Sequence, residues 1–190
     1  MLQKLPTYVG LAVADEPLLK TAPTNGRVET MSKTLREQLI GAWMLISCVE
    51  EPEDGSAPSH PMGEDPVGII LYTSDGYMAA QLMRRNRRTF SSGDWFEGTA
   101  EEYRSEASTY IAYSGPFHVD EERRTLTHSM LVSLFPNWTG QTQARVVEID
   151  GNMLHLSTGS PIRSAGKIVM AHLRRRRADP IGLENRLTEV

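Results

Sequence analysis

Three side chains in the second half of the chain, His128, Arg145 and Tyr113, are of types that move protons or stabilise charge. Histidine titrates near neutral pH, so His128 is a candidate general acid or base. Arg145 is a candidate for binding a carboxylate or stabilising an enolate-like oxyanion, and Tyr113 is a candidate proton donor. Each also has a structural interpretation: a hydrogen-bonded buried histidine, an ion-paired arginine and a tyrosine that caps an apolar core.

Alternation along the predicted strands suggests which side chains face an enclosed space. Residues 141–149 place Gln143 and Arg145 on the same face as Val147 and Ile149, which favours an inward orientation. In residues 125–135, one face is apolar except for a single histidine and carries Leu126, His128, Met130, Val132 and Leu134. In residues 77–84, the face predicted to point inward carries Tyr77, Ala79, Gln81 and Met83.

An apolar wall with a few convergent polar groups is typical of a small-molecule pocket. Trp138 follows Pro136 and Asn137 in a loop, so it either closes the mouth of such a pocket or packs at a turn. The predicted substrate-binding residues are Tyr77, Gln81, Met83, Met130, Val132, Trp138 and Gln143, beside the catalytic candidates His128, Arg145 and Tyr113.

Other sequence features argue against metal, nucleotide and thiol chemistry. None of the five histidines stands at a His-x-His or His-Glu-x-x-His spacing, so no metal site is predicted. No phosphate-binding glycine loop occurs, and we expect no cofactor. No Gly-x-Ser-x-Gly elbow occurs either, which argues against serine hydrolysis. Cys48, the single cysteine, lies in an apolar run and is expected to be a buried, inert thiol. The basic runs 84–88 and 174–177 are expected to be solvated strand ends, with binding of an anionic substrate group as the alternative.

The elements that must position these residues are mostly short strands. Thr34 and Glu37 form a capping-box pattern ahead of a helix over 35–40, and residues 100–108 suggest a second short helix. Asp-Gly turns at 75–76 and 150–151 each separate two strand-like runs. The predicted strands cover residues 42–50, 68–73, 77–84, 110–119, 125–135, 141–149, 153–158 and 167–174. This pattern predicts an all-β protein, an antiparallel barrel of about eight strands, whose interior just holds one small ligand.

Length and charge limit the remaining possibilities. The chain of 190 residues predicts one barrel domain at 34–178, with a partly ordered extension at 1–33 and a tail at 179–190. A formal net charge of −4 argues against a nucleic-acid partner. No apolar run approaches the roughly 20 residues of a membrane span, and no secretory signal is apparent, so a cytoplasmic protein is expected. A homodimer formed through residues 1–33 is an open alternative.

Four stretches in order resemble the lipocalin-like domain family, which occurs in bacteria and fungi, often beside secondary-metabolite genes. The stretches are Leu39–Trp43, Gly68–Gln81, Tyr110–Gly115 and Leu134–Gly140, and the resemblance covers roughly residues 35–177. It implies a small lipocalin-like barrel and a small hydrophobic partner molecule, but it implies no catalytic set.

Two functions follow from these observations. The first is a cofactor-independent isomerase or cyclase that holds a hydrophobic secondary-metabolite intermediate in a reactive conformation while His128, Arg145 and Tyr113 move a proton or stabilise charge. The second is a non-catalytic carrier of a small hydrophobic molecule, which would use the same interior.

Overall fold

The computed structural model describes residues 33–180, and most of the expected extension and tail lies outside this range. Eight strands form the barrel: β1 (Gly41–Pro52), β2 (Val67–Tyr72), β3 (Tyr77–Met83), β4 (Tyr110–Asp120), β5 (Thr125–Ser129), β7 (Thr142–Asp150), β8 (Met153–Thr158) and β10 (Lys167–Arg177). Two short strands, β6 (Val132–Ser133) and β9 (Ile162–Ser164), pair with β4 and β10.

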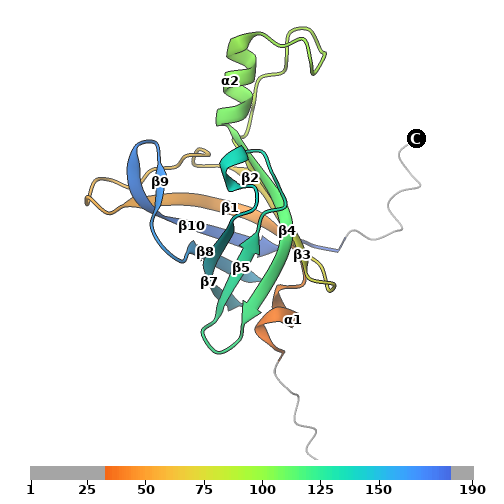
Figure 1. Cartoon of the computed structure of the whole chain (residues 1–190), viewed down its shortest axis with the longest axis vertical. Helices are drawn as coiled ribbons and strands as arrows, with labels where there is room; N and C mark the ends of the chain where they lie inside the picture. The colour runs from red at the N-terminus through yellow and green to blue at the C-terminus, as the bar shows by residue number, and fades with distance from the viewer. Residues whose placement is uncertain (1–32, 181–190) are drawn as a thin grey trace, which may run out of the picture. The chain divides into compact units, whose positions relative to one another are not determined.

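Closure of the barrel comes from β1, which pairs antiparallel with both β2 and β10. The long strand β1 reaches both neighbours because its register shifts between Leu45 and Ser47, which bends the strand. The eight-stranded antiparallel barrel expected from the sequence is therefore confirmed, and Figure 1 shows the strands wrapped around a common interior.

Helix α1 (Leu35–Leu39) covers one end of the barrel. The predicted capping box is present, with Thr34 and Glu37 each bonded to the other's backbone amide. Glu121, in the turn after β4, accepts hydrogen bonds from the backbone amides of Leu35 and Arg36 at 2.7 and 3.0 Å. Leu35 and Leu39 are buried, so the helix is attached to the barrel by a capped N-terminus and an apolar face.

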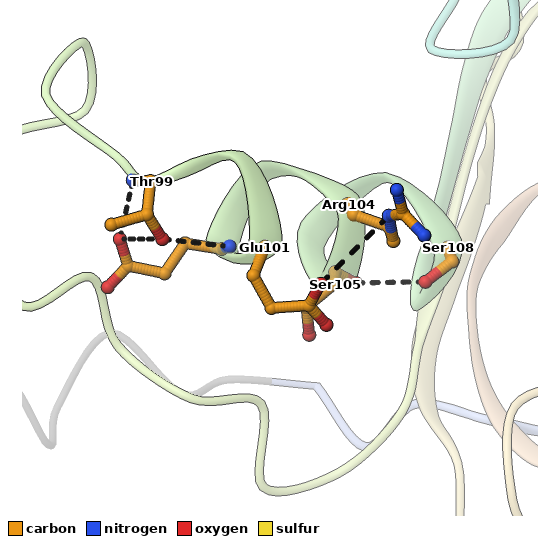
Figure 2. Close-up of polar contacts among 6 residues, drawn as sticks. Thr99, Glu101, Arg104, Ser105 and Ser108 are labelled. Carbon is orange, nitrogen blue, oxygen red and sulfur yellow. Dashed lines mark hydrogen bonds and ion pairs between the residues drawn. The ribbon is translucent and has the colours of Figure 1, made fainter.

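Helix α2 (Ala100–Ser108) projects beyond the other end of the barrel, at the start of β4 (Figure 1). None of its residues is buried, so its order depends on local hydrogen bonds. Its N-terminal capping box joins Thr99 to Glu102, and Figure 2 also shows the ion pair of Glu101 with Arg104 and the hydrogen bond from the Ser108 hydroxyl to the carbonyl of Ser105. The expected helix at 100–108 is confirmed, and it stands as an appended element rather than as part of the core.

The predicted strand over 125–135 is wrong in its second half. The chain leaves the ladder after Ser129 and re-enters it as β6, with its register against β4 advanced by one residue. Gly115 allows this crossing, because a Cβ there would collide with the carbonyl oxygen of Ser129. An extra residue of this kind reverses which side chains face inward.

The apolar core fills the end of the barrel nearest α1. It contains Leu35, Leu39, Trp43, Ile70, Tyr72, Met78, Ala80, Phe117, Leu126, Val147, Leu154 and Leu156. The indole nitrogen of Trp43 donates to the carbonyl of Leu39 at 2.8 Å, which joins the core to the helix. This end of the barrel is closed by side chains, so any ligand must enter from the other end.

Candidate functional site

A cavity of about 610 Å³ occupies the half of the barrel away from α1. Its walls come from inward residues of β1, β3, β4, β7, β8 and β10: Cys48, Glu50, Leu82, Ile111, Tyr113, Gln143, Arg145, Thr158, Ala171 and Leu173. Its mouth is framed by Pro61 and Met62 before β2, the end of α2, residues 134–138 and the β9 hairpin. The volume lies within the range of about 300–1,000 Å³ usual for small-molecule sites.

The mouth has an aromatic side. Trp138, on the 3₁₀ helix η1 (Pro136–Trp138), packs edge to face with Tyr113 at a centroid distance of 5.8 Å and with Phe135 at 5.6 Å. Pro136 at the first turn of η1 fixes the chain direction there. Trp138 therefore packs at a turn and lines the mouth, and its role in closing the mouth over a ligand stays a prediction.

Arg145 stands on the β7 wall, with 7 % of its surface exposed. Its guanidinium donates to the side-chain oxygen of Gln143 at 2.6 Å and to the carbonyl of Ala144 at 2.9 Å. Within residues 33–180, no carboxylate lies within 4.0 Å of it, so the structural ion pair considered for this residue is wrong for the described part of the chain. Arg145 therefore keeps its charge available to the cavity.

His128 is completely buried beneath the cavity and is not part of its lining. Its Nε2 shares a hydrogen bond of 2.9 Å with the hydroxyl of Tyr72, and Nδ1 has no partner among the described residues. Burial, and then the positive charges of Arg145 and Arg175, hold the pKa of His128 well below its usual value. The histidine is thus neutral at physiological pH and belongs to the core.

Arg175 lies deeper in the interior, and the sequence analysis missed it. Along β10 the inward positions are Val169, Ala171, Leu173, Arg175 and Arg177, and Arg175 is only 1 % exposed. The expectation that the run 174–177 is solvated is wrong for Arg175, which is buried because strand alternation turns it inward. The alternation within 167–177 was the signal that would have identified it.

Four of the predicted site residues line the cavity together: Tyr113, Trp138, Gln143 and Arg145. Met130 is buried, at 1 % exposure, but it lies outside the lining. The roles given to all of these residues in binding or catalysis stay predictions.

Tyr77, Gln81 and Met83 are not brought to the cavity, and the inward orientation expected for them is wrong. Met78, Ala80 and Leu82 face inward instead, because β3 pairs with β2 so that Ala80 lies opposite Ile70. Both faces of β3 carry apolar residues, so alternation alone was ambiguous there. Tyr77 is 51 % exposed, on the outer surface.

Val132 is also outside the cavity, at 66 % exposure, because the extra residue between β5 and β6 turns it outward. Leu134, two residues further along, lines the mouth. The apolar face predicted for 125–135 therefore holds for Leu126, His128 and Met130 and ends where the strand breaks.

Cys48 lines the cavity wall as a buried thiol, and burial raises its pKa to about 11. It therefore stays protonated and is a poor nucleophile. The described part of the chain contains no cluster of three or more side chains that could hold a metal ion. Nor does it contain a helix with the length and hydropathy needed to cross a bilayer.

Comparison with known proteins agrees with this geometry. Over 95 residues the chain is 38 % identical to the 4'-hydroxy-3'-methoxypropiophenone carrier protein ppsC of Aspergillus oryzae, a match that covers 47 % of this chain and 86 % of that protein. The lipocalin-like domain family matches residues 40–178, which include all eight barrel strands and every wall of the cavity. The protein belongs to the lipocalin-like domain family.

Proposed function

We propose that this protein is a carrier that binds a small, largely apolar organic molecule in its barrel cavity as part of secondary metabolism. The observation that supports this most directly is the cavity itself, about 610 Å³ in volume, closed at the α1 end and open at the other. An apolar molecule that enters such a space leaves water, which provides the main driving force for binding.

The wall composition supports a ligand with an aromatic or extended apolar body. Leu82, Ile111 and Leu173 provide apolar walls, and the ring of Trp138 stands at the mouth. Gln143 and Arg145 are polar groups that would orient the ligand. Because the relative ppsC is named for carrying a substituted propiophenone, an aryl ketone of this size is the first ligand to test.

The alternative is the isomerase or cyclase acting on a hydrophobic intermediate. Its acid–base candidate, His128, lies outside the cavity lining and bonds to Tyr72, which is a poorer position for contact with a ligand than that of Arg145 or Tyr113. The carrier function requires only the enclosed space and its orienting groups, so we favour it. A cytoplasmic location, the absence of nucleic-acid and membrane partners, and a homodimer through residues 1–33 are further proposals.

The test is calorimetric titration of the full-length protein with 4'-hydroxy-3'-methoxypropiophenone, followed by chromatography of the recovered ligand. We expect saturable binding with one site per chain and unchanged ligand. Conversion of the ligand into an isomer or a cyclised product would favour the enzyme instead.

Two variants test whether the ligand binds in the cavity. Ala171→Phe places a ring in the cavity from β10, and we expect affinity to fall by at least about tenfold, since the occupied volume is no longer available. Ala79→Phe adds the same ring to the outer face of β3 and is the matched control, expected to bind as the wild type does. Equal binding by both variants would place the ligand elsewhere on the protein.

A further inference from the structure

The inner face of β10 leads from the cavity to the closed end of the barrel. Ala171 and Leu173 line the cavity, Arg175 is the next inward residue, and Arg177 follows it. Successive inward positions on a strand lie roughly 7 Å apart. Arg175 therefore lies directly below the level of the cavity lining.

The guanidinium of Arg175 is unsatisfied in the described part of the chain. Its Nε and Nη1 atoms are buried and have no hydrogen-bond partner among residues 33–180. A buried charge without a partner is strongly unfavourable, and proteins normally pair it. Burial lowers the pKa of Arg175, and this effect is opposed by Tyr113, Tyr72 and Cys48, of which Tyr113 and Cys48 line the cavity. A hydrogen-bond acceptor for the Arg175 guanidinium would thus approach it from the cavity.

A second cation, Arg145, lies on β7, which is separated from β10 only by β8, and it lines the cavity. Its hydrogen bonds go to neutral oxygens of Gln143 and Ala144, which leave its charge uncompensated. Both Arg145 and Arg175 act on the same neutral histidine, His128, and depress its pKa. The cavity floor is therefore a region of concentrated positive charge.

Few groups oppose that charge. Glu50 is the one buried carboxylate of residues 33–180, and its side chain bonds to Ser59 at 3.4 Å on the β1 side of the cavity. The lining arginine Arg84 lies at the mouth, is exposed and donates to the carbonyl of Pro61. Two buried guanidinium groups against one buried carboxylate leave one positive charge without a counterpart.

We propose that the bound molecule is a monoanion, whose ionised oxygen lies on the cavity floor against Arg145 and above Arg175, an inference that rests on the binding function proposed above. Its apolar body extends toward Leu134, Phe135 and Trp138 at the mouth. The charge-assisted hydrogen bonds of Arg145, together with the nearby charge of Arg175, select an anion over a neutral molecule of the same shape. A single excess charge in an otherwise apolar cavity matches one carboxylate or one phenolate rather than a doubly charged phosphate.

The experiment compares two ligands of nearly equal shape, 2-naphthylacetate and 2-naphthylacetamide, by calorimetry with the full chain at neutral pH. We expect the carboxylate to bind at least about tenfold more tightly than the amide, the ratio that one or two charge-assisted hydrogen bonds provide. Equal affinities, or a preference for the amide, would overturn the proposal and leave the carrier function intact. Failure of both ligands to bind would count against the carrier function and the anion site together.

Variants identify the groups responsible. Arg145→Met and Arg175→Met keep an unbranched apolar chain and remove the charge, and in each we expect the preference for the carboxylate to fall to within about twofold while amide affinity is kept. Arg176→Met is the matched control, because Arg176 is the outward neighbour on the same strand and its loss changes net charge equally. A preference for the carboxylate that survives both Arg145→Met and Arg175→Met would also overturn the proposal. If a variant fails to fold, the ratio of carboxylate to amide affinity in the wild-type protein tests the proposal.

A third ligand distinguishes the two sources of an ionised oxygen. The affinity of 4-hydroxypropiophenone is measured across the pH range of its phenol ionisation. An affinity that rises as the phenolate forms identifies phenolates as ligands of the same site, whereas a flat profile together with a preference for naphthylacetate restricts the site to carboxylates.

Discussion

Two arginines on the inner face of β10, one at the closed end of the barrel and one below the cavity lining, differ in whether the protein supplies them with partners. At the closed end, Arg177 donates to the carbonyls of Gln38 and Ile40 at 2.5 and 3.0 Å, and its guanidinium lies 4.0 Å from the ring centre of Trp43. Two residues earlier on the same inner face, Arg175 has two buried nitrogens without partners in the described chain. One arginine completes the protein's own structure, and the other is left without a partner of its own.

On the same strand, therefore, Arg177 stabilises the fold and Arg175 is available to a ligand. Gly41 makes the closed end possible, because its positive φ and missing side chain admit the Arg177 guanidinium within about 3.1 Å of where a Cβ would stand. Arg175, below the cavity lining, has no such complement, and proteins often keep groups unsatisfied where they bind ligands. The closed end should therefore be sensitive to substitution, and the cavity and its mouth should tolerate it.

The largest expected effect is that of Trp43→Ala at the closed end. The indole is fully buried and bonded to Leu39, so its loss should lower the free energy of unfolding by about 3–5 kcal/mol, measured by urea denaturation. Trp138→Ala at the partly exposed mouth is the comparison and should cost about 1 kcal/mol. Equal losses at the two sites would break the contrast between the two ends.

The two arginines give the next largest effect. Arg177→Met removes hydrogen bonds from a charged donor and should lower stability by roughly 1.5–3 kcal/mol. Arg175→Met removes an unpaired buried charge, so the ligand-free protein should be as stable as the wild type or more stable. Thermal denaturation without ligand measures both, and a large loss for Arg175→Met would reveal a partner for this residue in the wild-type protein.

A pH titration tests the neutral histidine beneath the cavity. Because the folded pKa of His128 is depressed, only the unfolded chain takes up a proton as the pH falls below about 6.5, and stability falls with it until the lower folded pKa is reached. The slope from one histidine is at most about 1.4 kcal/mol per pH unit. His128→Gln should flatten the stability profile in this window, and an unchanged profile would contradict the depressed pKa.

The smallest expected effect is confined to α2. Thr99→Ala removes a helix cap worth about 1 kcal/mol, but the helix has no buried residue, so only its own amides should exchange faster. Hydrogen exchange should register the change while the urea midpoint of the barrel stays the same. A shift of that midpoint would mean that α2 and the barrel unfold together.

The stabilising effect of the same cap on α2 depends on pH, through the carboxylate of Glu102. The amides of Ser91 and then Thr99 lower the pKa of Glu102 to about 2 from its usual 4.5. Since the folded pKa is the lower one, the contribution of Glu102 to the order of α2 is complete above pH 4.5 and is lost as the pH falls toward 2. After correction for the intrinsic pH dependence of amide exchange, the protection of the α2 amides should fall across this range in the wild type and stay nearly constant in Glu102→Gln.

Much of the fold was predictable because its signals are local. The capping box at Thr34 needs only residues three positions apart, and the Asp75-Gly76 and Asp150-Gly151 turns need only two adjacent residues. Strand positions followed from the runs between such turns. The missed strand β9 is three residues long, too short to show a period.

The site was predictable only in part. Gln143 and Arg145 were placed in the interior from alternation, Tyr113 was a candidate because of its residue type, and all three line the cavity. The orientation of β3 was wrong because both of its faces are apolar, and that of Val132 was wrong because a bulge reversed the alternation. Arg175 was missed because four consecutive arginines look alike until one knows which of them turn inward.

By itself, the sequence determined where the chain turns, where its two helices begin and which segments form short strands. These features depend on neighbours along the chain. The tertiary structure alone decided which face of β3 is inside, where the ladder breaks after Ser129 and which arginines are buried. Those outcomes depend on register between strands distant in sequence, and a shift of one residue reverses every side chain that follows.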